Sequence, residues 1–306
     1  MVRNHLVLSG SGARFVSFLG AIRCLHKVLD PGFIKNTKSI VASSGGALVA
    51  VMIALGYSLE LMENLSMSID YSQMRNFNVA SFLDRCGLDD GAKFVRLFRS
   101  MIAGKLQSGD ATLYDLYLHS GCKVVITGTD LTAMKPVAFD HISYPTMPIW
   151  LALRATMSMP LLFTPVRHAD TCFVDGAMLS PFPMSMLFDR CEVIDGDTVV
   201  GLRLNYKPRD ADTSDLPGYL MALTRTMLAH VKNLDSEILH KRPRMHVIDI
   251  YTDPAESLFD LEKSVRQRAS LVRSAYDETL DYFGTQQTVH RLVSDIMQRV
   301  CKNVTY

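Results

Sequence analysis

The sequence lacks the features of disordered, nucleic-acid-binding and zinc-binding proteins. Its 32 lysines and arginines nearly balance 31 aspartates and glutamates, whereas a protein that binds a phosphate backbone needs a basic excess. The six cysteines form no CxxC pair and no cysteine–histidine pair at zinc-ligand spacing. Hydrophobic residues make up 48% of the chain, which is enough to form a folded core. We therefore expect a globular protein with reduced thiols and no nucleic-acid partner.

Long hydrophobic runs and interdomain linkers are also missing. The most apolar stretch, 40–57, is interrupted by Ser43 to Gly46, which leaves about ten apolar residues, half of what a bilayer-spanning helix requires. The apolar run at 6–8 is too short for a secretory signal. No repeat and no Pro/Gly/Ser-rich linker is present. These absences predict an intracellular, cytoplasmic protein that is not secreted and has no transmembrane helix.

The spacing of apolar residues predicts strands that alternate with helices. Strands or extended segments are expected at 6–8, 39–42, 123–127, 136–139, 161–166, 171–174, 198–204 and 246–250. Helices are expected at 18–29, 47–55, 148–157 and 216–238, with a helical excursion over 58–119 and two helices over 258–301 that break near Gly284. In the helix 216–238, apolar residues including Leu220, Leu223 and Met227 recur at spacings of three and four, which favours one buried face. This order favours one α/β domain with a parallel-rich sheet between helices.

The first candidate site is the loop Gly10-Ser11-Gly12. It lies between a strand and a helix, where backbone N–H groups can surround a negative oxygen. A dinucleotide fingerprint does not fit, because Phe15 occupies its third glycine position and no acidic residue ends the second strand. A phosphate-binding P-loop lacks its Gly-Lys-Ser/Thr. An oxyanion hole and a plain glycine turn both remain open.

The second candidate is a strand-to-helix turn that carries a serine between small residues, as in a nucleophile elbow. In the pattern G-x-S-x-G, Ser44 takes the serine position and Gly46 the last position, while Ala42 replaces the first glycine. Ser43 is the rival nucleophile, but its frame would place the β-branched Val41 at the first position. An ordinary loop is the alternative to the elbow.

A serine nucleophile needs a base, and Asp175 is one candidate. It ends a hydrophobic extended run and is followed by Gly176, which frees the backbone to turn. An Asp-Gly pair between apolar runs is also a common hairpin signal, and spacing alone favours the hairpin. A Ser-His-Asp triad in the order of the α/β-hydrolases is a further alternative. The histidines that follow Asp175 and would complete it are His230, His240, His246 and His290.

Together these segments resemble the patatin-like phospholipase family. The resemblance covers roughly residues 5–205, and its segments are LVLSGSGAR at 6–14, ASSGGAL at 42–48, TGTDL at 127–131, RATMSMP at 154–160, FTPV at 163–166 and FVDGA at 173–177. It implies a three-layer α/β sandwich in which helices flank a central, parallel-rich mixed sheet. We expect a single domain over 1–306, with the helical C-terminal part, 214–301, packed on the same domain.

The resemblance also implies an activity: hydrolysis of fatty-acyl esters by a Ser-Asp dyad, of the phospholipase A or lysophospholipase type, without metal or cofactor. Carried over residue by residue, Ser44 is the nucleophile and Asp175 the base. The loop Gly10-Ser11-Gly12 supplies the oxyanion hole, in which the backbone N–H groups of Ser11 and Gly12 hold the oxyanion. The expected substrate is a phospholipid or another acyl lipid at a membrane surface, so we expect peripheral contact with membranes. The oligomeric state stays open.

Three residues support the expected site, and three others depart from the family pattern. Arg14 matches the basic residue of the family's first loop, and Gly46 and Gly176 are the small residues that follow the dyad members. Ser11, Phe15 and Ala42 stand where the family has glycines. Those three replacements define the alternative function, a catalytically inactive lipid-binding or scaffold protein.

Overall fold

The computed structural model describes residues 3–78, 82–206, 213–214, 216–239, 245–252 and 264–303. A central sheet contains β1 (Asn4–Leu8), β2 (Thr37–Ala42), β4 (Lys123–Asp130), β5 (Lys135–Phe139), β7 (Val166–His168), β8 (Thr171–Asp175), β9 (Thr198–Tyr206) and β10 (Met245–Thr252). The strand order is β10-β9-β1-β2-β4-β8-β7, and β5 pairs with β4. From β10 to β4 the strands are parallel, whereas β5, β7 and β8 pair antiparallel.

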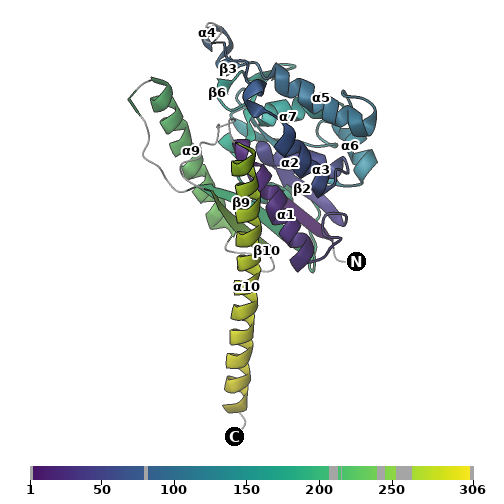
Figure 1. Cartoon of the computed structure of the whole chain (residues 1–306), viewed down its shortest axis with the longest axis vertical. Coiled ribbons are helices and arrows are strands. Elements are labelled where there is room, and N and C mark those ends of the chain that lie inside the picture. The colour runs from purple at the N-terminus through teal and green to yellow at the C-terminus, as the bar shows by residue number, and fades with distance from the viewer. Residues whose placement is uncertain are drawn as a thin grey trace.

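Helices cover both faces of this sheet (Figure 1). Side chains alternate along each strand, so that Leu6 and Leu8 of β1 join the larger buried cluster while Val7 joins the smaller one. The larger cluster includes α1 (Val16–Val28), α2 (Gly45–Ala54) and α10 (Val265–Asn303). The smaller cluster includes α8 (Met184–Arg190). The predicted three-layer sandwich with a mixed, parallel-rich sheet is confirmed.

The structure also contains further helices, short helical turns and a small second sheet. The helices are α3 (Leu59–Ser68), α4 (Phe82–Arg85), α5 (Ala92–Leu106), α6 (Leu113–Ser120), α7 (Ile149–Thr156) and α9 (Leu216–Leu239), and the short helical turns are η1 (Gly12–Arg14), η2 (Tyr71–Met74) and η4 (Gly176–Met178). A small parallel sheet joins β3 (Gly87–Asp89) to β6 (Leu161–Phe163). The predicted helical excursion therefore holds α3 to α6 and contributes one short strand.

Two expectations about the C-terminal helices are wrong. The helix α10 is continuous through Gly284, since a single glycine costs a helix only about 1 kcal/mol and neighbouring turns sustain it. In α9, Leu223 and Met227 were expected on the buried face but are exposed, while Leu228 is buried. The buried face of α9 is set by its contacts with α8 and η4, which cover only one stripe of the helix.

The pairing of β4 brings two distant strand ends together. The first half of β4 pairs with β2, as far as Ala42 opposite Ile126. The second half pairs with β8, where Asp175 lies opposite Gly128. Because β5 occupies the other edge of β4, both β2 and β8 must lie along the same edge. Because β2 runs parallel to β4 and β8 runs antiparallel to it, the carboxyl ends of β2 and β8 approach each other. They lie opposite Ile126 and Gly128, two residues apart on β4.

Candidate active site

Ser44 lies in a tight turn between β2 and α2. Its φ of 49° and ψ of −126° belong to a strained region for a residue with a side chain, of the kind found at functional sites. Gly46 allows the elbow to pack closely on the end of β1, because a Cβ atom there would lie 2.5 Å from the carbonyl oxygen of Ser9. Ala42 is not among the residues with positive φ, so a methyl group is tolerated at the first elbow position. The predicted strand-to-helix elbow is present at Ser44.

Ser44 and Asp175 contact each other although 131 positions separate them in the sequence. The Ser44 hydroxyl donates a hydrogen bond of 2.8 Å to Oδ2 of Asp175. Oδ1 of the same carboxylate accepts the Ala177 N–H at 2.8 Å. The hairpin expected at Asp175 and Gly176 does not form. Gly176 instead begins η4 and packs so closely on β4 that a Cβ atom would lie 2.4 Å from the Thr127 carbonyl oxygen.

The carboxyl group of Asp175 is held in an environment that disfavours its charge. Only 1% of the residue is exposed. Burial raises the pKa of Asp175 from 3.8 to about 7, against the opposing hydrogen bonds from Ala177 and Ser44. A carboxyl group with this pKa exchanges its proton near neutral pH, which suits a general base.

The rival nucleophile, Ser43, points elsewhere. It is fully buried, its hydroxyl has no hydrogen-bond partner among the described residues, and it does not line the cavity beside the dyad. Its backbone N–H donates to the carbonyl oxygen of Leu8, which ties the elbow to β1. The structure therefore brings Ser44, and not Ser43, to Asp175.

The loop after β1 packs against the elbow, and its three residues differ in what they offer. The Gly10 N–H donates to the carbonyl oxygen of Pro181 at 2.8 Å, so Gly10 shapes the loop but offers no free donor to an oxyanion. Within the described part of the chain, the N–H groups of Ser11 and Gly12 have no acceptor. Gly12 has a φ of +53°, whereas Ser11 has a φ of −139° that any residue can adopt.

A third N–H without an acceptor among the described residues belongs to Gly45, which follows the nucleophile. A Cβ atom on Gly45 would lie 3.3 Å from the Gly12 nitrogen, so the two backbones are in close contact. The residue after a nucleophile commonly donates to an oxyanion, but our sequence reasoning did not single it out.

Arg14 braces the loop from inside the protein. It is 1% exposed, and its guanidinium donates to the Thr252 hydroxyl near the end of β10. Arg14 therefore does not face solvent. Phe15, at the third position after Gly12, has an ordinary helical φ of −55° and packs edge-on against Tyr71.

The end of α7 holds both members of the dyad in place, which sequence reasoning missed. The Ser44 N–H donates to the buried hydroxyl of Thr156 at 2.8 Å. The Asp175 N–H donates to the carbonyl oxygen of Ser158 at 3.0 Å. Arg154 donates in turn to the Ser158 hydroxyl, and burial lowers the pKa of Arg154 to about 10. All three residues belong to the segment 154–160, whose resemblance to the family was the available signal.

A cavity of about 330 Å³ opens beside the dyad. Ser44, Asp175 and the loop 9–15 border it at one point, while its other walls are mainly apolar. The apolar lining includes Leu48, Met52, Tyr71, Phe94, Phe98, Met101, Met157, Met159, Phe163 and Leu228. A few polar groups in an apolar cleft can orient a largely hydrophobic ligand.

Where their side chains are described, the candidate triad histidines do not bond to Ser44. His246 packs against Phe283 with ring centroids 5.1 Å apart, and His230 is exposed on α9. His240 lies outside the described residues, as does the side chain of His290. The position that a triad would give to histidine is occupied by Asp175.

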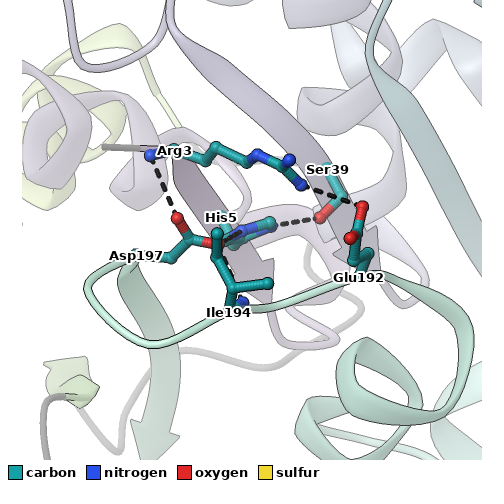
Figure 2. Close-up of polar contacts among 6 residues, drawn as sticks. All are labelled: Arg3, His5, Ser39, Glu192, Ile194 and Asp197. Carbon is teal, nitrogen blue, oxygen red and sulfur yellow. Dashed lines mark hydrogen bonds and ion pairs between the residues drawn. The ribbon is translucent and has the colours of Figure 1, made fainter. Parts of the chain in front are cut away.

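A Ser-His-Asp cluster does exist near the amino ends of β1 and β2 (Figure 2). His5 lies between the Ser39 hydroxyl at 2.6 Å and Asp197 at 3.1 Å. Asp197 also accepts the N–H groups of Arg3 and Ile194. All three members are buried and none lines the cavity at Ser44, so this network joins strands rather than presenting a nucleophile.

Two features are absent from the part of the chain that the structure describes. No three histidine, cysteine, aspartate or glutamate side chains gather as a metal site would require. No described helix combines the length and apolar character needed to cross a membrane.

The chain is similar in sequence to a known family and to viral proteins. The family described as patatin-like phospholipase matches residues 6–188. An uncharacterised protein of Acanthamoeba polyphaga mimivirus is 25% identical over 84% of this chain and 86% of its own length. A probable lipid hydrolase of invertebrate iridescent virus 6 is 22% identical over 59% of this chain and 62% of its own length.

Solved structures show the same fold. The crystal structure of VipD from Legionella pneumophila aligns with a TM-score of 0.58 at 16% identity, over 93% of this chain and 67% of that protein. Human GIVD cytosolic phospholipase A2 aligns with a TM-score of 0.51 at 10% identity, over 95% of this chain and 59% of that protein.

Proposed function

The chain belongs to the patatin-like phospholipase family, and from that premise we propose that it is a lipid acyl hydrolase with Ser44 as nucleophile and Asp175 as general base. The observation that carries the proposal is the 2.8 Å hydrogen bond from the Ser44 hydroxyl to a buried carboxylate at the edge of an apolar cavity. The name of the viral relative, a probable lipid hydrolase, supports the same class of activity. The expected substrates are the fatty-acyl esters that enzymes of the phospholipase A or lysophospholipase type hydrolyse.

In the first half of the reaction, the Ser44 oxygen attacks the ester carbonyl carbon while its proton passes to Asp175. The oxygen of the carbonyl group becomes an anion, which the N–H groups of Ser11, Gly12 and Gly45 are free to bind. Collapse of this intermediate breaks the ester bond, and Asp175 returns the proton to the departing alcohol. The fatty acyl group is then bound to Ser44.

In the second half, a water molecule attacks the acyl group and gives its proton to Asp175. The carboxylate then returns that proton to the Ser44 oxygen, and the fatty acid is released. The same group acts twice as base and twice as acid, so a pKa of about 7 serves both directions of proton transfer. The apolar cavity accommodates the acyl chain beside the reacting ester.

The three departures from the family pattern are compatible with this chemistry. Neither Ser11 nor Ala42 lies at a positive φ, so neither side chain strains the backbone. Phe15 directly precedes α1, has helical dihedral angles and contributes to the cavity wall. These observations favour an active enzyme over the inactive lipid-binding alternative.

The test is release of fatty acid by the purified protein from a short-chain ester and from lysophosphatidylcholine, in the presence of EDTA. We expect turnover by the wild type and by Ser43→Ala, and none above background by Ser44→Ala. Circular dichroism would confirm that each variant is folded. Undiminished turnover by Ser44→Ala, or none by a folded wild type on a panel of acyl esters, would refute the proposal.

A further inference from the structure

The helix α9 carries an apolar ridge that the rest of the described chain leaves uncovered. Tyr219, Leu223 and Met227 are spaced four residues apart and so lie along one face of the helix. They are 53%, 42% and 51% exposed, respectively. Isolated exposed apolar residues are ordinary, but three in a row along one helix mark an interaction surface.

This ridge adjoins the cavity beside the dyad. Leu228, the next residue after Met227, points inward, lines the cavity and packs with Ala177 and Met159. Ala177 belongs to η4, the turn that directly follows Asp175, and η4 contacts α9. One side of α9 therefore forms part of the cavity wall while the neighbouring side faces solvent.

The charge pattern of α9 suits a phospholipid surface. Between positions 216 and 234, the part of α9 that carries the ridge, the sequence has no aspartate or glutamate and its charged residues are Arg225 and Lys232. The acidic residues of α9, Asp235 and Glu237, follow two turns beyond Met227, near the end of the helix. A helix face without acidic groups is not repelled by lipid phosphates, and its apolar side chains gain free energy by leaving water.

We propose that the apolar ridge of α9 docks on a lipid surface and thereby places the cavity at the source of its substrate. The proposal rests on the lipid acyl hydrolase function proposed above. A lipid surface fits better than a second copy of this chain, because the same helix borders the cavity that must receive an acyl chain. Binding through the ridge is driven by apolar insertion, so it persists at high salt.

The chain offers a matched control for this test on α6. Tyr114 and Leu118 have the same residue types and the same spacing as Tyr219 and Leu223, and they are 46% and 63% exposed. In Figure 1, α9 lies at the left of the molecule and α6 at the right, well apart from each other. Replacement of both residues by glutamine removes apolar surface from either helix without breaking it, because glutamine is a good helix former.

Binding is measured by flotation with phosphatidylcholine vesicles, using Ser44→Ala as the parent so that lipid is not consumed. We expect Tyr219→Gln/Leu223→Gln to lower the vesicle partition coefficient about tenfold, since two half-exposed side chains no longer leave water on binding. The Tyr114→Gln/Leu118→Gln control should bind as the parent does, at both 0.1 M and about 1 M salt. Equal losses in both double variants, or binding that salt abolishes, would overturn the assignment to α9.

Activity assays on proteins that retain Ser44 distinguish this inference from the proposed function. We expect the α9 double variant to hydrolyse a soluble short-chain ester at the wild-type rate and vesicle phospholipid several-fold more slowly. Wild-type rates on both substrates would overturn the ridge proposal and leave the hydrolase function intact. A wild type inactive on the soluble ester would instead count against the hydrolase itself. Sedimentation that shows a dimer dispersed by the α9 variant, with vesicle binding unchanged, would assign the ridge to a second copy and also overturn the proposal.

Discussion

Replacement of Asp175 by asparagine should make the protein more stable while removing its activity. Asp175 is 1% exposed, and burial raises its pKa from 3.8 to about 7. Between these two values the folded protein binds a proton that the unfolded chain has released. Rising pH therefore lowers the free energy of unfolding over this interval.

The magnitude follows from the shift itself. About three pKa units at about 1.4 kcal/mol each amount to about 4 kcal/mol, which is the full loss once the pH exceeds about 7. About 2.5 kcal/mol of this loss falls between pH 5 and pH 8. Asparagine has nearly the same shape, keeps an acceptor for the Ala177 N–H and carries no charge. The stability advantage of Asp175→Asn should therefore grow by about 2.5 kcal/mol over that range.

The assay is urea unfolding of the wild type and Asp175→Asn at half-unit steps from pH 5 to pH 8. Ser44→Ala is the control, because it changes the same hydrogen bond but keeps the carboxyl group. Its stability should fall with pH at least as steeply as that of the wild type, since the Ser44 hydroxyl lowers the pKa of Asp175. A pH-independent difference between Asp175→Asn and the wild type would refute the account of this carboxyl group.

Three further outcomes follow from the same geometry. The kcat/KM for a soluble ester should rise with pH, reach half its maximum near pH 7 and then level off, because Asp175 must be ionised to accept a proton; a flat profile from pH 5.5 to 8.5 would contradict this role. Thr156→Val should lower kcat roughly tenfold with little change in KM, and Thr156→Ser should restore it, since the hydroxyl holds the Ser44 N–H; an unchanged kcat would show that this bond does not position the elbow. Asp197→Ala should lower the free energy of unfolding, measured in urea at pH 7, by about 3 kcal/mol, because the N–H groups of Arg3 and Ile194 and the buried ring of His5 lose their hydrogen-bond partner. Activity per folded molecule should stay the same. Burial raises the pKa of Asp197, but its hydrogen bonds hold the pKa below 3.8, so this stabilisation should disappear only as the pH falls below about 4.

The parts of the site that depend on local sequence were predicted from it. Small residues around Ser44 fit an elbow, and glycines in the loop after β1 fit an anion-binding turn. Local pattern failed at Asp175, where Asp-Gly favoured a hairpin. The outcome there depends on β4, which is long enough to pair with β2 and β8 along one edge. Such pairing links residues far apart in the sequence, and no spacing rule records it.

Other features that local sequence did not reveal have the same origin. The Gly10 N–H is occupied because Pro181 approaches from a distant segment, and Thr156 reaches Ser44 from the end of α7. In α9, the spacing of Leu223 and Met227 predicted a covered face. Hydrophobic periodicity shows that a stripe exists, but not whether the chain itself or an external surface covers it.

The nucleophilic serine is tested most directly by a fluorophosphonate probe, which reacts at a useful rate only with an activated serine. Labelling at pH 8, followed by peptide mass mapping, should place the adduct on Ser44 in the wild type and in Ser43→Ala. Ser44→Ala should not be labelled, and Asp175→Asn should be labelled about a hundredfold more slowly because it lacks the base. A folded wild type that stays unlabelled, or an adduct on Ser43, would contradict the assignment of Ser44 and Asp175 as the catalytic pair.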